Sequence, residues 1–142
     1  MRALLYTVYV QGTEVPLRVD LNSSIPVYRQ IVDGLRILLV NGELKPGDSM
    51  PPVRRLALDL GVHFNTVAEA YRTLADEGWL EIGRRTGARV MQRAKPNRVD
   101  PQSGEVFQRR LRELIAEQQS RGVTRGRIAR ELRRLADSLE RT

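Results

Sequence analysis

The chain has 142 residues, a formal net charge of +7 at pH 7 and a single histidine, and it contains no cysteine. These features exclude disulfides and thiolate metal sites and argue against a histidine-based metal cluster, so we expect no metal or other cofactor. No apolar run approaches the roughly 20 residues of a membrane span, and the apolar start lacks the cleavage site of a signal peptide, so we expect a cytoplasmic protein with no membrane partner.

The positive charge favours a polyanionic partner such as nucleic acid, but it is unevenly distributed. Residues 23–91 carry nine basic and eight acidic side chains, whereas residues 105–142 carry ten and six. A DNA-binding face in the central segment must therefore depend on where its charges lie. All but two of the 24 basic residues are arginine. Arginine forms bidentate contacts with phosphate and guanine, although a GC-rich genome would produce the same bias.

Residues 1–22 contain two alternating runs, LLYTVYV and VPLRVDL, on either side of QGTE. This pattern predicts a hairpin with Gly12 at its turn, and Pro16 favours an edge strand. A disordered extension is the alternative for the first dozen residues. We treat residues 1–22 as an N-terminal extension.

Residues 23–91 contain the densest apolar pattern, which begins with a helix. Ser23 or Ser24 is expected to cap this helix, with Pro26 in its first turn. Asn41 and Gly42 end it, and KPGD forms a turn. Its wide apolar stripe consists of Val27, Tyr28, Ile31, Val32, Leu35, Leu38 and Leu39, the spacing of a buried helical face.

Two further helices and a hairpin follow in the same segment. A short helix is expected over residues 52–60, a turn at Gly61, and a third helix over residues 64–77. Strands at WLEI and ARVM flank the turn GRRTG. Val67, Ala70, Tyr71 and Leu74 recur at the spacing of a buried helical face. We interpret Tyr71 and Trp79 as core residues rather than as platforms on which bases stack.

This order of elements predicts a winged helix-turn-helix, a mainly α fold with a small β wing. In this motif the third helix enters the major groove by its N-terminal end, and the wing lies over the backbone or minor groove. The face opposite the predicted core face carries Asn65, Thr66, Ala68, Glu69 and Arg72.

The side chains on this face and on the wing suit DNA. Asn65 can pair with adenine, and Thr66 can bind phosphate or a thymine methyl group. Glu69 would repel the DNA backbone unless it meets a cytosine amino group or pairs with Arg72. Arg84 and Arg85 on the wing suit phosphate contact and minor-groove insertion.

Residues 92–104 have the composition of a linker, and residues 105–142 predict two amphipathic helices, the second capped by Thr124. Two such helices are too small to enclose a metabolite pocket of some 300 Å3, but two copies of them could form a four-helix bundle. We therefore predict a dimerisation region. Its apolar residues are Phe107, Leu111, Leu114, Ile115, Ile128, Leu132, Leu135 and Leu139.

Residues 20–91 resemble the DNA-binding domain of the GntR family of bacterial transcription regulators. The resemblance rests on PVYRQI, the G-x-L-x-PGD turn, PPVRRLA, LGV-x-x-NTV, AYRTLADEGWL and the R-x-x-G of the wing. It implies a homodimer that binds a palindromic double-stranded operator, usually as a repressor relieved by a small-molecule effector. The short two-helix tail is similar to the YtrA-type branch, whose members often sit beside genes for ATP-binding-cassette transporters.

The family's DNA contacts carry over to Arg54, to the start of the third helix from His63 to Thr66, and to Arg84. The sequence departs from the family at four positions. The family usually has a small cap residue in place of His63, arginine in place of Phe64, a long side chain in place of Ala68, and often glycine in place of Arg85. His63 is either a helix cap or a contact to phosphate or base. Phe64 either packs on an apolar neighbour or meets a thymine methyl group.

Two other classes of function compete with a regulator. A winged helix can serve as a protein–protein adaptor, which would need a sizeable exposed apolar patch on the third helix. Phe64 and Ala68 are the only hints of such a patch. An enzyme is disfavoured because the chain has no glycine-rich phosphate loop, no cysteine nucleophile, and no evident carboxylate to orient His63.

Overall fold

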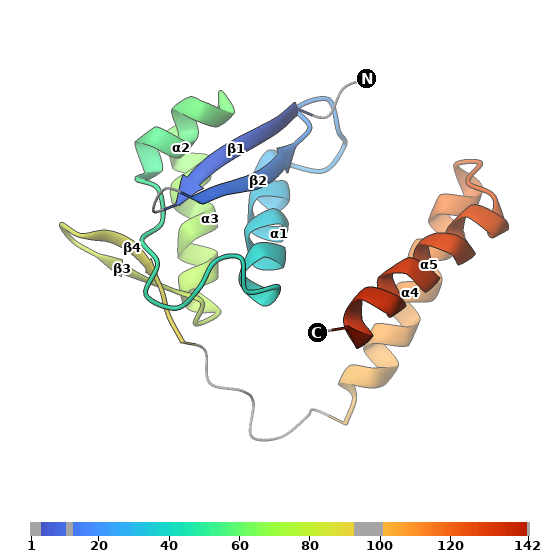
Figure 1. Cartoon of the computed structure of the whole chain (residues 1–142). Helices are drawn as coiled ribbons and strands as arrows, with labels where there is room; N and C mark the ends of the chain where they lie inside the picture. Colours follow the sequence, from blue (N-terminus) through green and yellow to red (C-terminus); the bar gives the residue numbers. More distant parts are fainter. Residues whose placement is uncertain (1–3, 11–12, 93–100, 142) are drawn as a thin grey trace. The chain divides into compact units, whose positions relative to one another are not determined.

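The computed structural model describes residues 4–10, 13–92 and 101–141, which belong to two compact units, Met1–Ala94 and Lys95–Thr142 (Figure 1). The first unit contains two small sheets and three helices, and the second contains two helices. The fold is mainly helical with a small β component, as predicted. Within the described ranges, no helix has the length and apolar character needed to cross a membrane.

The first unit begins with the hairpin that the alternating pattern predicts. Strands β1 (Leu4–Val10) and β2 (Thr13–Val19) pair in antiparallel register, with Val10 opposite Thr13 and Thr7 opposite Pro16. Pro16 is tolerated because each strand of a two-stranded sheet is an edge strand. The predicted turn residue Gly12 lies outside the described residues.

Strand β2 contributes to the core of the unit, which the sequence pattern did not predict. Leu17 and Val19 are fully buried, while the alternating residues Pro16 and Arg18 are exposed, because successive side chains point to opposite faces of a strand. The strand lies tightly against the first helix. A Cβ added to Gly34 of that helix would lie 2.5 Å from Leu17 Cδ1.

Helix α1 (Val27–Val40) buries the predicted apolar stripe but begins differently from the prediction. Its N-cap residue is Pro26, which has an extended backbone and whose side chain forms no capping hydrogen bond. The prediction of a serine cap was therefore wrong. Ser23 Oγ instead accepts a hydrogen bond from the Ile25 amide. The Gln30 side-chain amide donates to the carbonyls of Asp20 and Ile25, which fixes the chain where it enters the helix.

Helices α2 (Val53–Leu60) and α3 (Phe64–Asp76) form the helix-turn-helix. Gly61 ends α2 with a φ of 68°, a left-handed conformation that glycine adopts without strain. The predicted core face of α3 is confirmed, and Trp79 packs half-buried against the core just beyond it. The buried residues of this face are Val67, Ala70, Tyr71 and Leu74.

Polar contacts also join α1 to α3 at the surface. The Arg36 guanidinium binds both carboxylate oxygens of Glu77, with Nε 3.1 Å from Oε2 and Nη2 2.5 Å from Oε1. The hydrogen bond with Glu77 raises the pKa of Arg36. The hydroxyl oxygens of Tyr28 and Thr73 lie 2.6 Å apart. These contacts fix the position of α3 relative to α1.

The wing is a second two-stranded sheet, β3 (Leu80–Gly83) and β4 (Gly87–Val90), with Gly83 opposite Gly87. The segment that precedes α2 pairs with the other edge of β4. The Gly47 amide donates to the Val90 carbonyl and the Met50 amide to the Ala88 carbonyl, both at 2.8 Å. The wing is therefore held by the same segment that leads into α2.

The second unit consists of α4 (Ser103–Ser120) and α5 (Arg125–Glu140), which run antiparallel (Figure 1). Helix α4 begins within the range predicted as linker, and residues 93–100 of that range lie outside the described residues. The predicted cap is confirmed, because Thr124 Oγ1 accepts a hydrogen bond from the Arg127 amide at 3.3 Å. Neither helix contains a buried residue.

Candidate DNA-binding surface

The start of α3 is capped by His63. The Nδ1 atom of this residue accepts a hydrogen bond from the Asn65 amide at 3.1 Å, and its carbonyl accepts one from the Thr66 amide at 3.0 Å. Asn, Asp, Ser and Thr usually provide this kind of cap. His63 therefore takes the role of the small cap residue that the family resemblance implies at this position.

Phe64 is the first residue of α3 and has 41% of its surface exposed. Its ring lies beside the imidazole of His63, with the ring centroids 4.6 Å apart and the ring planes 28° apart. The guanidinium carbon of Arg54, from α2, lies over the same ring at 5.2 Å from its centroid. We call Arg54, Phe64 and His63 the Phe64 cluster.

The cluster joins two segments that the sequence does not link by any periodicity. Arg54 and Phe64 lie on different helices on either side of the turn at Gly61, and both side chains are exposed. Apolar spacing predicts buried faces, but it carries no information about contacts between exposed side chains. Each residue was predicted as a DNA contact, and their mutual contact was not.

The exposed face of α3 carries the other predicted residues. Asn65, Glu69 and Arg72 are exposed, while Thr66 and Ala68 are half-buried. Glu69 and Arg72 form no ion pair within the described part of the chain. Among the described residues Glu69 has no basic partner, so its side chain adds a negative charge to this face.

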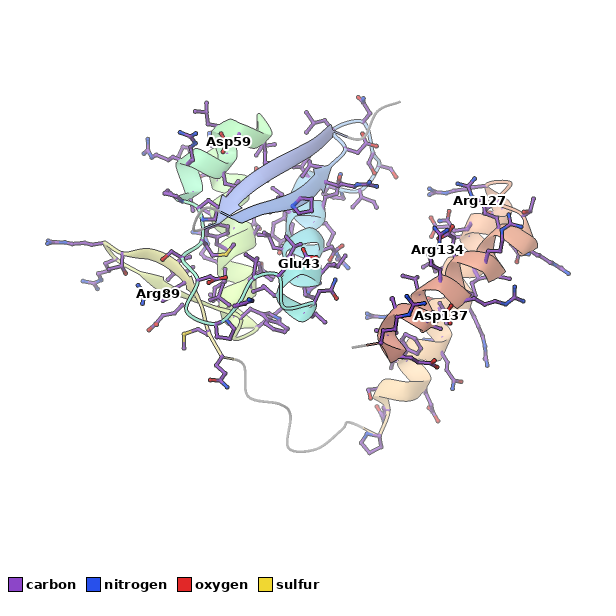
Figure 2. The ribbon with its side chains drawn as sticks, in the orientation of Figure 1. Glu43, Asp59, Arg89, Arg127, Arg134 and Asp137 are labelled. Atoms are coloured by element: carbon purple, nitrogen blue, oxygen red, sulfur yellow. The ribbon has the colours of Figure 1, made fainter. Side chains whose placement is uncertain are left out.

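The wing presents Arg84 and Arg85 at its exposed tip, between Gly83 and Gly87. A Cβ on Gly83 would collide with Thr86 Oγ1, so a larger residue at this position would require the Thr86 side chain to move. Arg89 lies farther along β4, as Figure 2 shows, and is also exposed.

A groove connects α3 to the wing. It has a volume of about 300 Å3, and its lining includes Ala68 and Arg72 from α3, Ile82 and Gly87 from the wing, and Pro52 before α2. The exposed face of α3 and the wing are therefore neighbours across one hollow. Such an arrangement allows one duplex to contact both elements.

The arginines around this surface have no acidic partner in the part of the chain that the structure describes. Among the described residues, Arg54, Arg72, Arg84 and Arg85 form no ion pair, whereas Arg55, adjacent to Arg54, lies 3.4 Å from Asp59. Unpaired arginines can bind phosphate or guanine without first breaking an internal contact.

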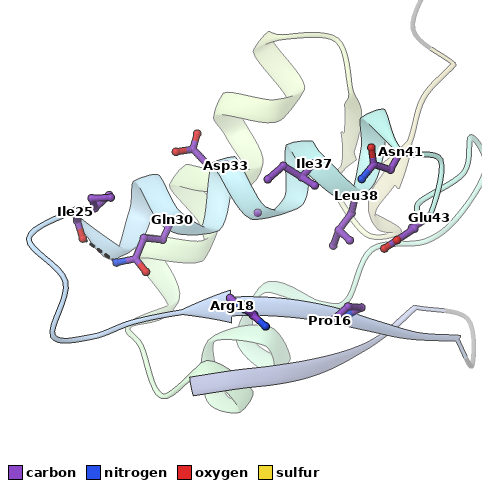
Figure 3. Close-up of a pocket in the computed structure, with 10 residues that line it drawn as sticks. Pro16, Arg18, Ile25, Gln30, Asp33, Ile37, Leu38, Asn41 and Glu43 are labelled. Carbon is purple, nitrogen blue, oxygen red and sulfur yellow. Dashed lines mark hydrogen bonds between the residues drawn. The ribbon is translucent and has the colours of Figure 1, made fainter. Parts of the chain in front are cut away.

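A separate groove of about 610 Å3 lies between β2 and α1 (Figure 3). It is lined by apolar side chains such as Ile25 and Ile37 and by the charged side chains of Arg18, Asp33 and Glu43. It contains none of the predicted DNA-binding residues.

The predicted dimerisation residues all lie on α4 and α5, and several are widely exposed. The exposed fraction is 64% for Phe107, 52% for Leu114, 60% for Leu135 and 79% for Leu139. A hollow of about 380 Å3 is lined by six of the eight predicted residues. Charged residues of the same helices, among them Arg127, Arg134 and Asp137, are exposed (Figure 2).

The fold and this surface define a winged helix-turn-helix of the DNA-binding class. Residues 27–90 match the family described as bacterial regulatory proteins, gntR family. The chain is 35% identical over 107 residues to the HTH-type transcriptional repressor YtrA of Bacillus subtilis, covering 75% of this chain and 82% of YtrA. The chain thus belongs to the GntR family of transcription regulators, which are not enzymes.

Solved structures agree with this assignment. YtrA from Sulfolobus acidocaldarius, a GntR-family transcription factor, is 33% identical, with a TM-score of 0.50 over 86% of this chain and 97% of that one. A transcriptional antiterminator from Listeria monocytogenes is 25% identical, with a TM-score of 0.62 over 86% of this chain and 87% of that one. The resemblance to the YtrA-type branch is confirmed.

Proposed function

We propose that the chain is a cytoplasmic homodimeric repressor that binds a palindromic double-stranded operator and controls genes for an ATP-binding-cassette transporter. The transporter genes and the relief of repression by a small effector follow from the resemblance to YtrA-type regulators. The identity of the effector is left open by this proposal.

One observation carries the DNA-binding part of the proposal. Arg72 on α3 and the wing lie on one groove, and the arginines at this surface, Arg54, Arg84 and Arg85, have no acidic partner among the described residues. Each duplex phosphate neutralised by such a cation releases a counterion, which favours binding at low salt. Solvent-exposed arginines elsewhere, such as Arg29 and Arg55, have acidic partners instead.

Base recognition is assigned to the first two turns of α3. Asn65 is exposed and can pair with adenine through its side-chain amide, and Thr66 can contact phosphate or a thymine methyl group. Glu69 is exposed one turn later and can accept a hydrogen bond from the amino group of cytosine. A carboxylate on this face disfavours the other bases and so contributes to specificity.

Dimerisation is assigned to α4 and α5. Their apolar residues remain exposed or half-buried within one chain, so the two helices do not cover their own apolar faces. A second copy of the pair would bury these faces in a four-helix bundle. Two DNA-binding units held in this way would match the two halves of a palindrome.

Selection of genomic fragments with the full-length chain tests the proposal, followed by titration of the enriched duplex. Arg54→Ala should weaken binding of that duplex by about tenfold or more, the range expected for loss of one bidentate contact. Arg55→Ala is the matched control, since Arg55 is the neighbouring arginine and already pairs with Asp59. It should leave the affinity nearly unchanged.

The result also separates a regulator from an adaptor. If no fragment is enriched at low salt while the chain remains folded, sequence-specific DNA binding fails and the winged-helix adaptor becomes the better hypothesis. If fragments are enriched but Arg54→Ala and Arg55→Ala both bind the duplex as tightly as the wild type, the proposal survives and the assignment of Arg54 is wrong.

A further inference from the structure

Phe64 is the first residue of α3, and its aromatic ring is partly exposed. Leaving apolar surface of this kind in water costs free energy. The ring contacts of this side chain are with two polar groups, the Arg54 guanidinium and the His63 imidazole. Phe64 therefore belongs to an exposed cluster at the DNA-binding surface, and 41% of its surface remains open to a partner.

The contact with Phe64 restrains Arg54 without occupying its donors. A guanidinium over an aromatic face within about 6 Å of the centroid is attracted by the ring quadrupole, and the distance here is 5.2 Å. This attraction involves the flat face of the guanidinium, whereas its N–H donors point outward in the plane. Arg54 has no ion pair in the described part of the chain that would compete for these donors.

His63 is restrained at the other contact of the ring. Its Nδ1 accepts the Asn65 amide, so in the neutral imidazole the proton is on Nε2. The imidazole can therefore offer one N–H donor to DNA while it caps the helix. The cluster thus presents N–H donors from Arg54 and His63, and the apolar ring of Phe64 contacts both residues.

We infer that the Phe64 cluster acts as one base-recognition unit, in which Phe64 is a positioning residue for Arg54 and itself determines specificity. This inference rests on the proposed DNA-binding function. Arg54, held over the ring, binds the O6 and N7 atoms of a guanine in the major groove. The exposed part of the Phe64 ring meets the methyl group of a neighbouring thymine.

This arrangement explains how the site can function without the arginine that the family resemblance implies at position 64. A second arginine would add a charge and another contact to DNA. Phe64 instead lowers the freedom of the arginine already present on α2 and adds an apolar contact. Preorganised arginine loses less side-chain entropy on binding, and the thymine methyl contact adds base preference at the neighbouring position.

The test uses the full-length chain and a duplex enriched from a randomised double-stranded library. Phe64→Leu keeps an apolar side chain but removes the ring, and it should weaken binding of this duplex by about two- to twentyfold. Phe64→Tyr keeps the ring and should restore most of the affinity. In the double variant Arg54→Ala with Phe64→Leu, the loss should be smaller than the product of the two single losses, because the residues act together.

Modified duplexes test the same contacts, and their effect on the wild type does not depend on how a variant folds. Replacing the contacted guanine by an analogue that lacks N7 should weaken binding by the wild type and should not weaken binding by Arg54→Ala further. Replacing the neighbouring thymine by uracil, which lacks the methyl group, should weaken binding by the wild type more than binding by Phe64→Leu.

The outcomes distinguish this inference from the proposed function. If the wild type enriches no duplex, the proposed function itself fails. If the wild type binds its duplex but Phe64→Leu binds equally well, or the two single losses multiply independently, the inference is overturned and the regulator remains. If the wild type binds the duplex with the guanine analogue that lacks N7 as tightly as the unmodified duplex, the guanine contact is likewise overturned.

Discussion

The Tyr71 hydroxyl donates a hydrogen bond to the backbone carbonyl of Pro51 at 2.7 Å. Tyr71 lies on the buried face of α3, and Pro51 lies two residues before α2. The bond therefore ties the helix that carries Phe64 to the segment that leads to Arg54. It contributes to the geometry on which the Phe64 cluster depends.

Replacing Tyr71 by Phe removes this bond while keeping the ring in the core. Pro51 is buried, so its carbonyl loses its partner and the free energy of unfolding should fall by about 1–2 kcal/mol. Urea denaturation followed by circular dichroism measures the change. Tyr28→Phe is a suitable control and should cost less, because its partner Thr73 is half-buried and can bind water instead. Equal costs for the two variants would contradict this account.

Because Tyr71 is buried, the free energy of unfolding should depend on pH in the alkaline range. Burial raises the pKa of Tyr71 above its ordinary value of about 10. The neutral phenol is thus favoured in the folded state, and this contribution is complete below about pH 10, the pKa of the unfolded chain. Above about pH 10 unfolding releases a proton, so the free energy of unfolding should fall as the pH rises.

Comparison with Tyr71→Phe isolates this effect from the other titrating groups. Between about pH 10 and the raised pKa, the wild type should lose up to about 1.4 kcal/mol more per pH unit than the variant. Urea denaturation at a series of alkaline pH values provides the measurement. Parallel pH profiles for the two proteins would show that Tyr71 is not held neutral by burial.

The helix-turn-helix was predictable because its helices bury one face at regular spacing. Val67, Tyr71 and Leu74 recur at that spacing and are all buried. The helix cap was less predictable. Serines at positions 23 and 24 carry the usual signal for a cap, but the extended backbone of Pro26 places the helix start after it.

Contributions that depend on tertiary structure were not predictable from local patterns. Leu17 alternates with exposed residues, which predicts a strand but does not identify the surface that the strand covers. Leu17 packs directly over Gly34 of α1, where a Cβ would lie 2.5 Å from Leu17 Cδ1. The contact of Arg54 with Phe64 likewise depends on how the turn at Gly61 places α2 and α3. Both side chains are exposed, so the spacing of buried apolar residues does not predict the contact.

Removing the wing arginines should change the salt dependence of DNA binding. Arg84→Ala and Arg85→Ala each remove an exposed cation without an acidic partner among the described residues. If each arginine binds one phosphate, each variant should reduce the slope of log affinity against log salt by about 1. Fluorescence anisotropy with the enriched duplex at several salt concentrations measures this slope.

A control on the same unit separates phosphate contact from a general effect of charge. Arg29→Ala removes one positive charge from α1, where Arg29 lies 3.6 Å from Asp33. This variant should leave the slope nearly unchanged, because Arg29 is not assigned to the DNA-binding surface. A reduction of the slope equal to that of the wing variants would contradict direct phosphate contact by the wing.

If α4 and α5 form the proposed dimer interface, a single charge on their apolar face should disrupt the dimer. Leu135 is 60% exposed in the single chain and lines the hollow between α4 and α5. If a second copy covers this face, Leu135→Asp buries an unpaired carboxylate in the bundle, which costs far more than the same charge in water. Sedimentation equilibrium should show monomers at concentrations where the wild type is dimeric.

Arg133→Asp is the matched control, because it introduces the same side chain on the same helix at an exposed position outside the apolar set. It should leave the dimer intact. The dimer-deficient Leu135→Asp variant should still bind a single half-site, since the winged helix-turn-helix is a separate compact unit with its own core. Its affinity for the full palindrome should fall because two half-sites are no longer linked. A dimeric Leu135→Asp variant with unchanged affinity would place the dimer interface elsewhere on the chain.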